Sequence, residues 1–75
     1  MTRTVHLEFG WRNDHIVSWL SDHVGPELGQ GGLFWWKGAE WLYEFEPFGP
    51  TPHKKVSFSD QVSESTVAQF ALTFT

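Results

Sequence analysis

Two groups of residues in this 75-residue sequence carry side chains that could do chemistry, namely four histidines and two closely spaced glutamates. His15 and His23 are eight positions apart, which is about 12 Å along a helix axis, so the two cannot hold one ion. A zinc-binding pair on a helix needs a spacing of four. No spacing pattern joins His6 or His53 to the other two, and we therefore expect no metal site.

Glu44 and Glu46 lie on one face of an expected strand, about 6–7 Å apart. Glycosidases use such carboxylate separations for acid–base catalysis, but their sites lie in clefts. The sequence offers no nucleophile paired with a base and no phosphate-binding loop ahead of a helix. We expect a protein that is not an enzyme and has no cofactor. A small ligand pocket near His6, Glu8 and Glu44 remains an alternative.

Composition narrows the class of protein further. Nine acidic residues against five basic ones give a net charge of −4, which argues against a phosphate-binding surface. There is no cysteine, so apolar packing must stabilise the fold, and thirteen aromatic residues are available for it. No apolar run could span a membrane, and the N-terminus lacks the apolar stretch of a signal peptide. These features predict a single cytoplasmic domain over 1–75.

The first third of the chain predicts a strand and then a helix. Val5, Leu7 and Phe9 alternate with polar residues, which indicates a half-buried strand. Asn13 is a good N-cap for a helix that ends before the Gly-Pro pair at 25–26, with an apolar stripe along one side. Residues 26–32, rich in glycine, predict a loop.

The most aromatic stretch predicts a β-hairpin. Residues 33–37 and 40–46 flank Gly38-Ala39, a pair that suits a two-residue type II′ turn. Lys37 would then oppose Glu40, and opposed residues share a face of the sheet. A four-residue loop would leave the same residues on each face. The predicted core face holds Phe34, Trp36, Trp41, Tyr43 and Phe45, and the predicted outer face holds Leu33, Trp35, Lys37, Glu40, Leu42, Glu44 and Glu46.

The last third predicts a loop at 47–53, a strand at 54–59, a short helix with Ser63 as its N-cap, and a final strand at 71–75 with Leu72 and Phe74 inward. The element order is close to β-α-β-β-α-β. We expect a small ferredoxin-like two-layer α+β sandwich, whose antiparallel sheet has 4–5 strands, with one long and one short helix. In that topology the first strand lies beside the third.

The outer face of the hairpin predicts a protein-binding surface. Trp35 would be the anchor, Leu33 and Leu42 its apolar surround, and Glu40, Glu44 and Glu46 a charged rim. An exposed tryptophan flanked by apolar residues has the composition of an interface hot spot. Trp19, on a helix flank with His15 and His23, is a second candidate. Scattered apolar residues are also ordinary on protein surfaces, and the same patch could pair two copies of the chain as a homodimer or accessory subunit.

Nucleic acid is the third class of partner to weigh. RNA-binding domains stack bases on the aromatic residues of an open sheet. Glu40, Glu44 and Glu46 would repel phosphates beside Trp35, so charge argues against this class. The carboxylates of Glu8, Glu40, Glu44 and Glu46 could instead imitate the phosphates of DNA, which would be a variant of protein binding.

The segment KVSFSDQVSESTVAQFALTFT, residues 55–75, resembles small proteins of tailed bacteriophages of the T4-like and cyanophage type. In these proteins an alternating strand leads through an acidic turn to a short helix and a final strand. The sequence departs from that pattern at Val67, where a small residue is usual, and at Ala71, where a lysine often lies. The resemblance implies a phage-encoded protein that binds a protein of the bacterial host and inhibits or redirects it. The matching residues are Val56, Phe58, Asp60, Val67, Phe70, Leu72 and Phe74.

Overall fold

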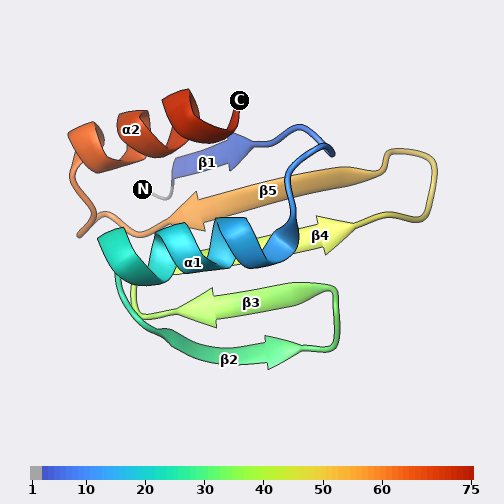
Figure 1. Cartoon of the computed structure of the whole chain (residues 1–75), viewed down its shortest axis with the longest axis horizontal. Coiled ribbons are helices and arrows are strands. Elements are labelled where there is room, and N and C mark those ends of the chain that lie inside the picture. The colour runs from blue at the N-terminus through green and yellow to red at the C-terminus, as the bar shows by residue number, and fades with distance from the viewer. Residues whose placement is uncertain (1–2) are drawn as a thin grey trace.

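Seven helices and strands follow one another along the part of the chain that the computed structural model describes, residues 3–75 (Figure 1). Met1 and Thr2 lie outside the described residues. The elements are β1 (Arg3–His6), α1 (Asn13–His23), β2 (Glu27–Gly31), β3 (Trp35–Gly38), β4 (Trp41–Glu46), β5 (His53–Phe58) and α2 (Glu64–Phe74).

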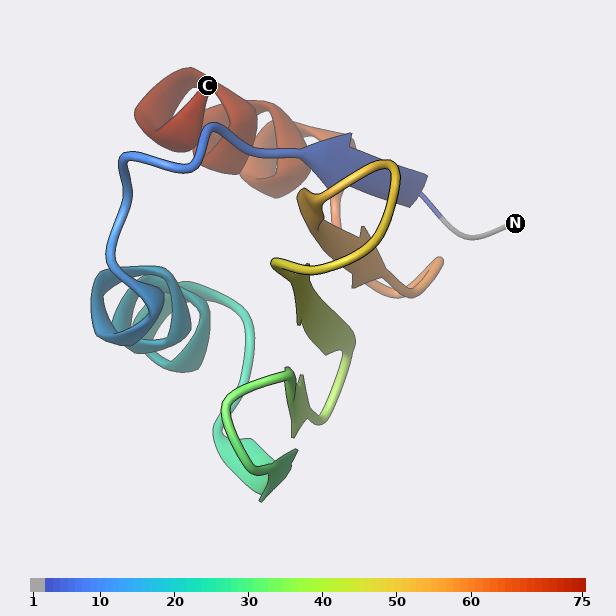
Figure 2. The same ribbon diagram turned by 90° about the vertical axis from the view of Figure 1, so that its right-hand side faces the viewer.

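The five strands form one antiparallel sheet in the order β1-β5-β4-β3-β2. Both helices lie on the same side of this sheet, as the edge-on view in Figure 2 shows, and no helix within residues 3–75 covers the opposite face. The expected two-layer α+β sandwich is therefore confirmed. We expected the first strand to lie beside the strand at 40–46, which is β4. This expectation is wrong, because β1 pairs with β5 at one edge of the sheet.

The core lies between the sheet and the helix layer. Ile16 and Leu20 of α1 and Phe70 of α2 are fully buried, and they face Tyr43 and Val56 of the sheet. Such dense aromatic and aliphatic packing is what a 75-residue chain without cysteine requires. Neither helix of the described chain is long and apolar enough to cross a membrane.

Helix α1 begins one residue earlier than the sequence predicts, so the expected N-cap at Asn13 is wrong. Arg12 holds the N-cap position, and Asn13 is the first helical residue. The Asn13 side chain is used elsewhere, since its Oδ1 accepts a hydrogen bond of 2.6 Å from the Tyr43 hydroxyl. At the other end the chain turns out of the helix at Gly25, whose N–H donates to the Leu20 carbonyl.

Strand β2 corrects the expectation of a loop at 26–32. Its backbone pairs with β3, with a bulge between Glu27 and Gly29. Glycine weakens a strand because it has no side chain to pack. Here the Trp35 indole lies across Gly31, so closely that a Cβ on Gly31 would stand 2.0 Å from the indole Nε1. The ring supplies the cover that the glycine lacks.

The β3–β4 hairpin has a wider turn than the sequence predicts. Lys37 pairs with Leu42 rather than with Glu40, a shift of two residues. A type II′ turn needs a positive φ at Gly38, whereas the positive-φ glycines of the described chain are Gly32 and Gly49. A shift of two keeps the paired residues of the two strands on their predicted faces.

The C-terminal strand expected at 71–75 is also wrong, because α2 continues without a break to Phe74. Phe70 and Phe74 are four positions apart, so both turn toward the sheet in a helix, while Leu72 is 85% exposed. The predicted N-cap is confirmed, since Ser63 Oγ accepts a hydrogen bond of 3.2 Å from the Thr66 N–H.

Candidate functional site

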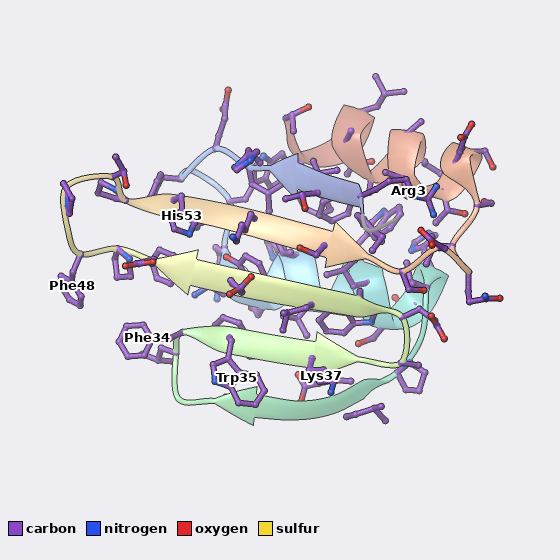
Figure 3. The ribbon with its side chains drawn as sticks, turned by 180° about the vertical axis from the view of Figure 1, so that it is seen from behind. Arg3, Phe34, Trp35, Lys37, Phe48 and His53 are labelled. Carbon is purple, nitrogen blue, oxygen red and sulfur yellow. The ribbon has the colours of Figure 1, made fainter. Side chains whose placement is uncertain are left out.

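The outer face of the sheet carries no helix, and its side chains stand in rows that cross the strands (Figure 3). One row carries an apolar, an acidic and a basic residue side by side, because Trp35 pairs with Glu44 and Glu44 pairs with Lys55. The next row holds Leu42 beside Lys37. Acidic, basic and apolar side chains therefore share this face, and Trp35 lies toward the β2 edge.

Trp35 points outward, as the pattern of alternation predicts. It is 42% exposed, in contrast to Trp36 and Trp41 on the other face, which are buried. The indole does not stand out into solvent but lies along the sheet over Gly31. This position offers a flat apolar surface to a partner, with one side already supported by the strand.

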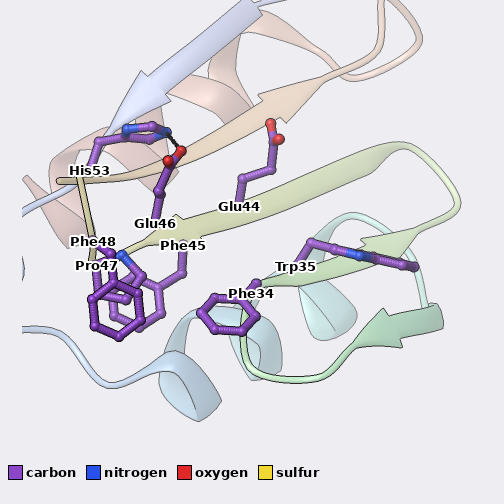
Figure 4. Close-up of a pocket in the computed structure, with 8 residues that line it drawn as sticks. All are labelled: Phe34, Trp35, Glu44, Phe45, Glu46, Pro47, Phe48 and His53. Atoms are coloured by element: carbon purple, nitrogen blue, oxygen red, sulfur yellow. Dashed lines mark ion pairs between the residues drawn. The ribbon is translucent and has the colours of Figure 1, made fainter. Parts of the chain in front are cut away.

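A groove of about 410 Å³ runs around the end of the sheet beside Trp35 (Figure 4). We call it the aromatic groove, and it brings together the start of β3, the end of β4, the turn after β4 and the start of β5. It is open to solvent along its length. The residues that line it are Phe34, Trp35, Glu44, Phe45, Glu46, Pro47, Phe48 and His53.

Two of the groove's most exposed rings are not among the predicted site residues. Phe34, expected in the core, is 51% exposed, and Phe48 is 72% exposed. The ring centroids lie 6.5 Å apart at an angle of 54°. Phe34 faces the core side by strand alternation, but it precedes the first residue of β3 and lies at the margin of the sheet. The sequence signal that could have indicated an exposed Phe48 is its position between two prolines, in the loop segment Pro47–Pro50.

Two carboxylates border the groove, and both are only loosely paired within the chain. Glu44 Oε1 lies 3.8 Å from the Lys55 Nζ, and Glu46 Oε2 lies 3.7 Å from the His53 Nε2. Both distances exceed that of a hydrogen bond. Partly exposed pairs of this kind contribute roughly 0–1 kcal/mol, because water and salt screen them. The carboxylate oxygens therefore remain able to accept hydrogen bonds from a ligand.

The groove is supported from behind by a buried lysine. Lys54 is 5% exposed, and its Nζ donates to the Trp11 and Phe9 carbonyls at 2.6 and 3.2 Å. The same ammonium lies 5.0 Å from the centre of the Phe45 ring and 5.6 Å from that of Phe9, within cation–π range. Burial lowers the pKa of Lys54. These contacts hold the loop after β1 against β5 and fix the ring of Phe45, which lines the groove.

The structure does not bring all the predicted site residues to this groove. Trp35, Glu44 and Glu46 line it. Glu40 lies in the β3–β4 turn, where its carboxylate accepts a hydrogen bond from the Ser59 hydroxyl. Leu42 is half-buried near the start of β4, away from the groove. Leu33 is exposed in the turn that precedes Phe34.

Trp19 belongs to the helix layer and not to the outer face. Its ring is half-buried, stacks on His23 at 4.1 Å and meets Phe70 and Phe74 edge-on. These contacts explain Trp19 as a support for the packing of α1 against α2. It therefore forms no part of the groove.

The histidines and carboxylates of the described chain do not converge. No group of three histidine, aspartate or glutamate residues within residues 3–75 is placed to hold a metal ion. The alternative pocket near His6 and Glu44 is interrupted, because Lys55 of β5 pairs with both and stands between them. Comparisons with known proteins add no assignment, since no protein family, no curated protein sequence and no solved structure matches this chain.

Proposed function

We propose that this chain is a non-enzymatic protein-binding module that contacts its partner through the aromatic groove and the adjoining face of Trp35. The observation that carries the proposal is the grouping of three exposed aromatic rings, Phe34, Trp35 and Phe48, around one groove. Contiguous exposed apolar surface is uncommon on small monomeric proteins and marks interaction sites. Aromatic residues are also enriched where interfaces are buried.

The partner we propose is a protein of a bacterial host, which the chain inhibits or redirects by covering part of its surface. This part of the proposal comes from the resemblance of residues 55–75 to small phage proteins. The groove supports a contact by occlusion, because it is open and borders an uncovered sheet face. The carboxylates of Glu44 and Glu46 would steer it toward a basic surface.

A second copy of the chain is the alternative occupant of the same surface. A two-fold interface places the same patch of each copy against the other. Two grooves would then bring two Glu44 and two Glu46 side chains together, and like charges in an interface are unfavourable. The geometry therefore favours a partner other than a second copy of the chain. Light scattering checks this preference by measuring the molecular mass in solution. A dimeric mass that falls to the monomeric value in Phe48→Ala would overturn the preference.

Site-specific photo-cross-linking in bacterial lysate tests the proposal. A photoreactive phenylalanine analogue replaces Phe48, and in a matched control it replaces Leu72, which is still more exposed at 85% but lies on α2. We expect one discrete cross-linked partner from position 48, absent from position 72 and lost on Trp35→Ala. Equal labelling from both positions would indicate surface stickiness and would overturn the proposal.

A further inference from the structure

The aromatic groove combines two kinds of group that together recognise a cation. Its floor and ends are aromatic, and its border carries the carboxylates of Glu44 and Glu46. The electron-rich faces of aromatic rings attract cations, and carboxylates form charge-assisted hydrogen bonds with them. An apolar peptide side chain would leave both carboxylates unused, whereas a cationic one would use every part of the lining.

The two carboxylates are placed to act together. They lie on the same face of β4, two residues apart, with side chains about 6–7 Å from each other. Glu44 is opposite Trp35 in the register, and Glu46 adjoins the turn that carries Phe48. Glu44 therefore lies beside Trp35 and Glu46 lies next to the turn that carries Phe48, although in Figure 4 the Glu46 carboxylate turns toward His53 and away from the Phe48 ring.

The openness of the groove selects among cations. A quaternary ammonium is bound by a closed cage of rings around it, whereas this groove is open along one side. The Phe34 and Phe48 rings are tilted by 54° and lie 6.5 Å apart, so they do not stack on each other and their faces stay available. A planar guanidinium can lie on one such face and still direct its N–H groups to a carboxylate at the edge.

We propose that the aromatic groove binds an arginine side chain presented by the partner protein, with the guanidinium stacked on Phe34 or Phe48 and hydrogen-bonded to Glu46. Glu44 and Trp35 hold the chain on either side of that arginine. The inference rests on the proposed function and specifies the chemistry of the partner. The basic side chains nearest the two carboxylates are weak competitors, because Lys55 and His53 approach Glu44 and Glu46 no closer than 3.8 and 3.7 Å, respectively.

The test is an NMR titration of the isotope-labelled full chain with three capped peptides, Gly-Arg-Gly, Gly-citrulline-Gly and Gly-Lys-Gly. Citrulline has nearly the shape of arginine without its charge. We expect the arginine peptide to shift the signals of the Trp35 indole N–H and of the backbone amides of Glu44, Phe45, Glu46 and Phe48. The citrulline and lysine peptides should bind about ten-fold more weakly, since each loses either the charge or the planar fork.

Variants locate the effect within the chain. Glu46→Gln and Phe48→Ala should each weaken the arginine peptide several-fold. Asp22→Asn is the matched control, since it removes an equal charge from the exposed last turn of α1, at the end of the molecule away from the groove, and should change nothing. Equal binding of arginine and citrulline, or of arginine and lysine, would overturn the inference, and so would shifts centred outside residues 34–48.

The two proposals fail in different ways. If the arginine peptide does not bind while cross-linking from position 48 persists, the arginine assignment is wrong and the protein-binding function stands. If both the peptide shifts and the cross-link are absent, the aromatic groove is not a binding surface and both proposals fall.

Discussion

Two tryptophans on opposite faces of the hairpin allow one chemical change to be compared in two environments. Trp41 is 3% exposed, whereas Trp35 is 42% exposed. The Trp41 ring packs over Gly38, and its Nε1 donates a hydrogen bond of 2.8 Å to the Gly25 carbonyl. The Trp35 ring covers Gly31 and makes no such bond in the described structure. Replacing each by alanine should therefore cost very different amounts of stability.

The difference can be worked from covered area. A tryptophan side chain can bury up to about 250 Å², so the two exposures differ by roughly 100 Å² of covered surface. At ~25 cal/mol per Å² this difference amounts to about 2.5 kcal/mol. Loss of the hydrogen bond to the Gly25 carbonyl adds about 1 kcal/mol. We predict that Trp41→Ala costs about 3–4 kcal/mol more unfolding free energy than Trp35→Ala.

Urea denaturation followed by far-ultraviolet circular dichroism measures both costs. A domain of this length has a total stability of about 4–11 kcal/mol, so Trp41→Ala is expected to leave it marginal or unfolded. Trp41→Phe keeps a ring in the site and provides a measurable intermediate should the alanine variant be unfolded. Equal losses in Trp35→Ala and Trp41→Ala, within about 1 kcal/mol, would refute the division of the hairpin into a core face and an exposed outer face.

Stability should also respond to pH and to one helix cap. Burial lowers the pKa of Lys54, so between that value and the lysine pKa of the unfolded chain, about 10.4, the unfolded state binds more protons and stability should rise with pH. Burial raises the pKa of Tyr43, so above about pH 10 the unfolded chain loses a proton that the folded chain keeps, and stability should fall. Urea midpoints from pH 7 to 11 check both signs, and Tyr43→Phe should remove the alkaline loss; a loss unchanged in that variant would contradict the assignment. Ser63→Ala should lower the free energy of unfolding by about 1 kcal/mol and Ser63→Gly by only a few tenths, because the helix N–H left without the serine oxygen is more accessible to water beside glycine. Equal losses of stability in both variants would show that the helix cap is not the cause.

The faces of the hairpin could be predicted because the alternation of a strand depends on parity alone. The turn at Gly38 is two residues wider than expected, yet Trp35 still faces outward and Tyr43 inward. A shift of one residue would have exchanged the faces. The sequence therefore determined which tryptophan is accessible even though it gave the wrong partner for Lys37.

The elements that sequence reasoning missed depend on contacts between distant residues. Residues 27–31 contain two glycines and no β-branched residue, and they form a strand only because β3 pairs with them and Trp35 covers Gly31. In the C-terminal segment, Phe70, Leu72 and Phe74 alternate as in a strand, but Phe70 and Phe74 also match a helix. The helical spacing of apolar residues runs from Val67 through Phe70 to Phe74. Packing of these residues into the core stabilises the helix relative to a strand.

The proposed binding surface lies where the sheet extends past its helices. Strands β4 and β5 have six residues each, and the turn between them projects beyond the helix layer (Figure 1). Rings at this end have less of the chain to cover them, so Phe48 is largely exposed, and Phe45 is held by the Lys54 ammonium instead of by a helix. The Lys54 ammonium lies against the Phe45 ring, and the carboxylates of Glu44 and Glu46 border the same groove. Under the arginine proposal, a cation from the partner takes up the two carboxylates that the chain itself pairs only at 3.7–3.8 Å, and this is the reason we propose a basic ligand rather than an apolar one.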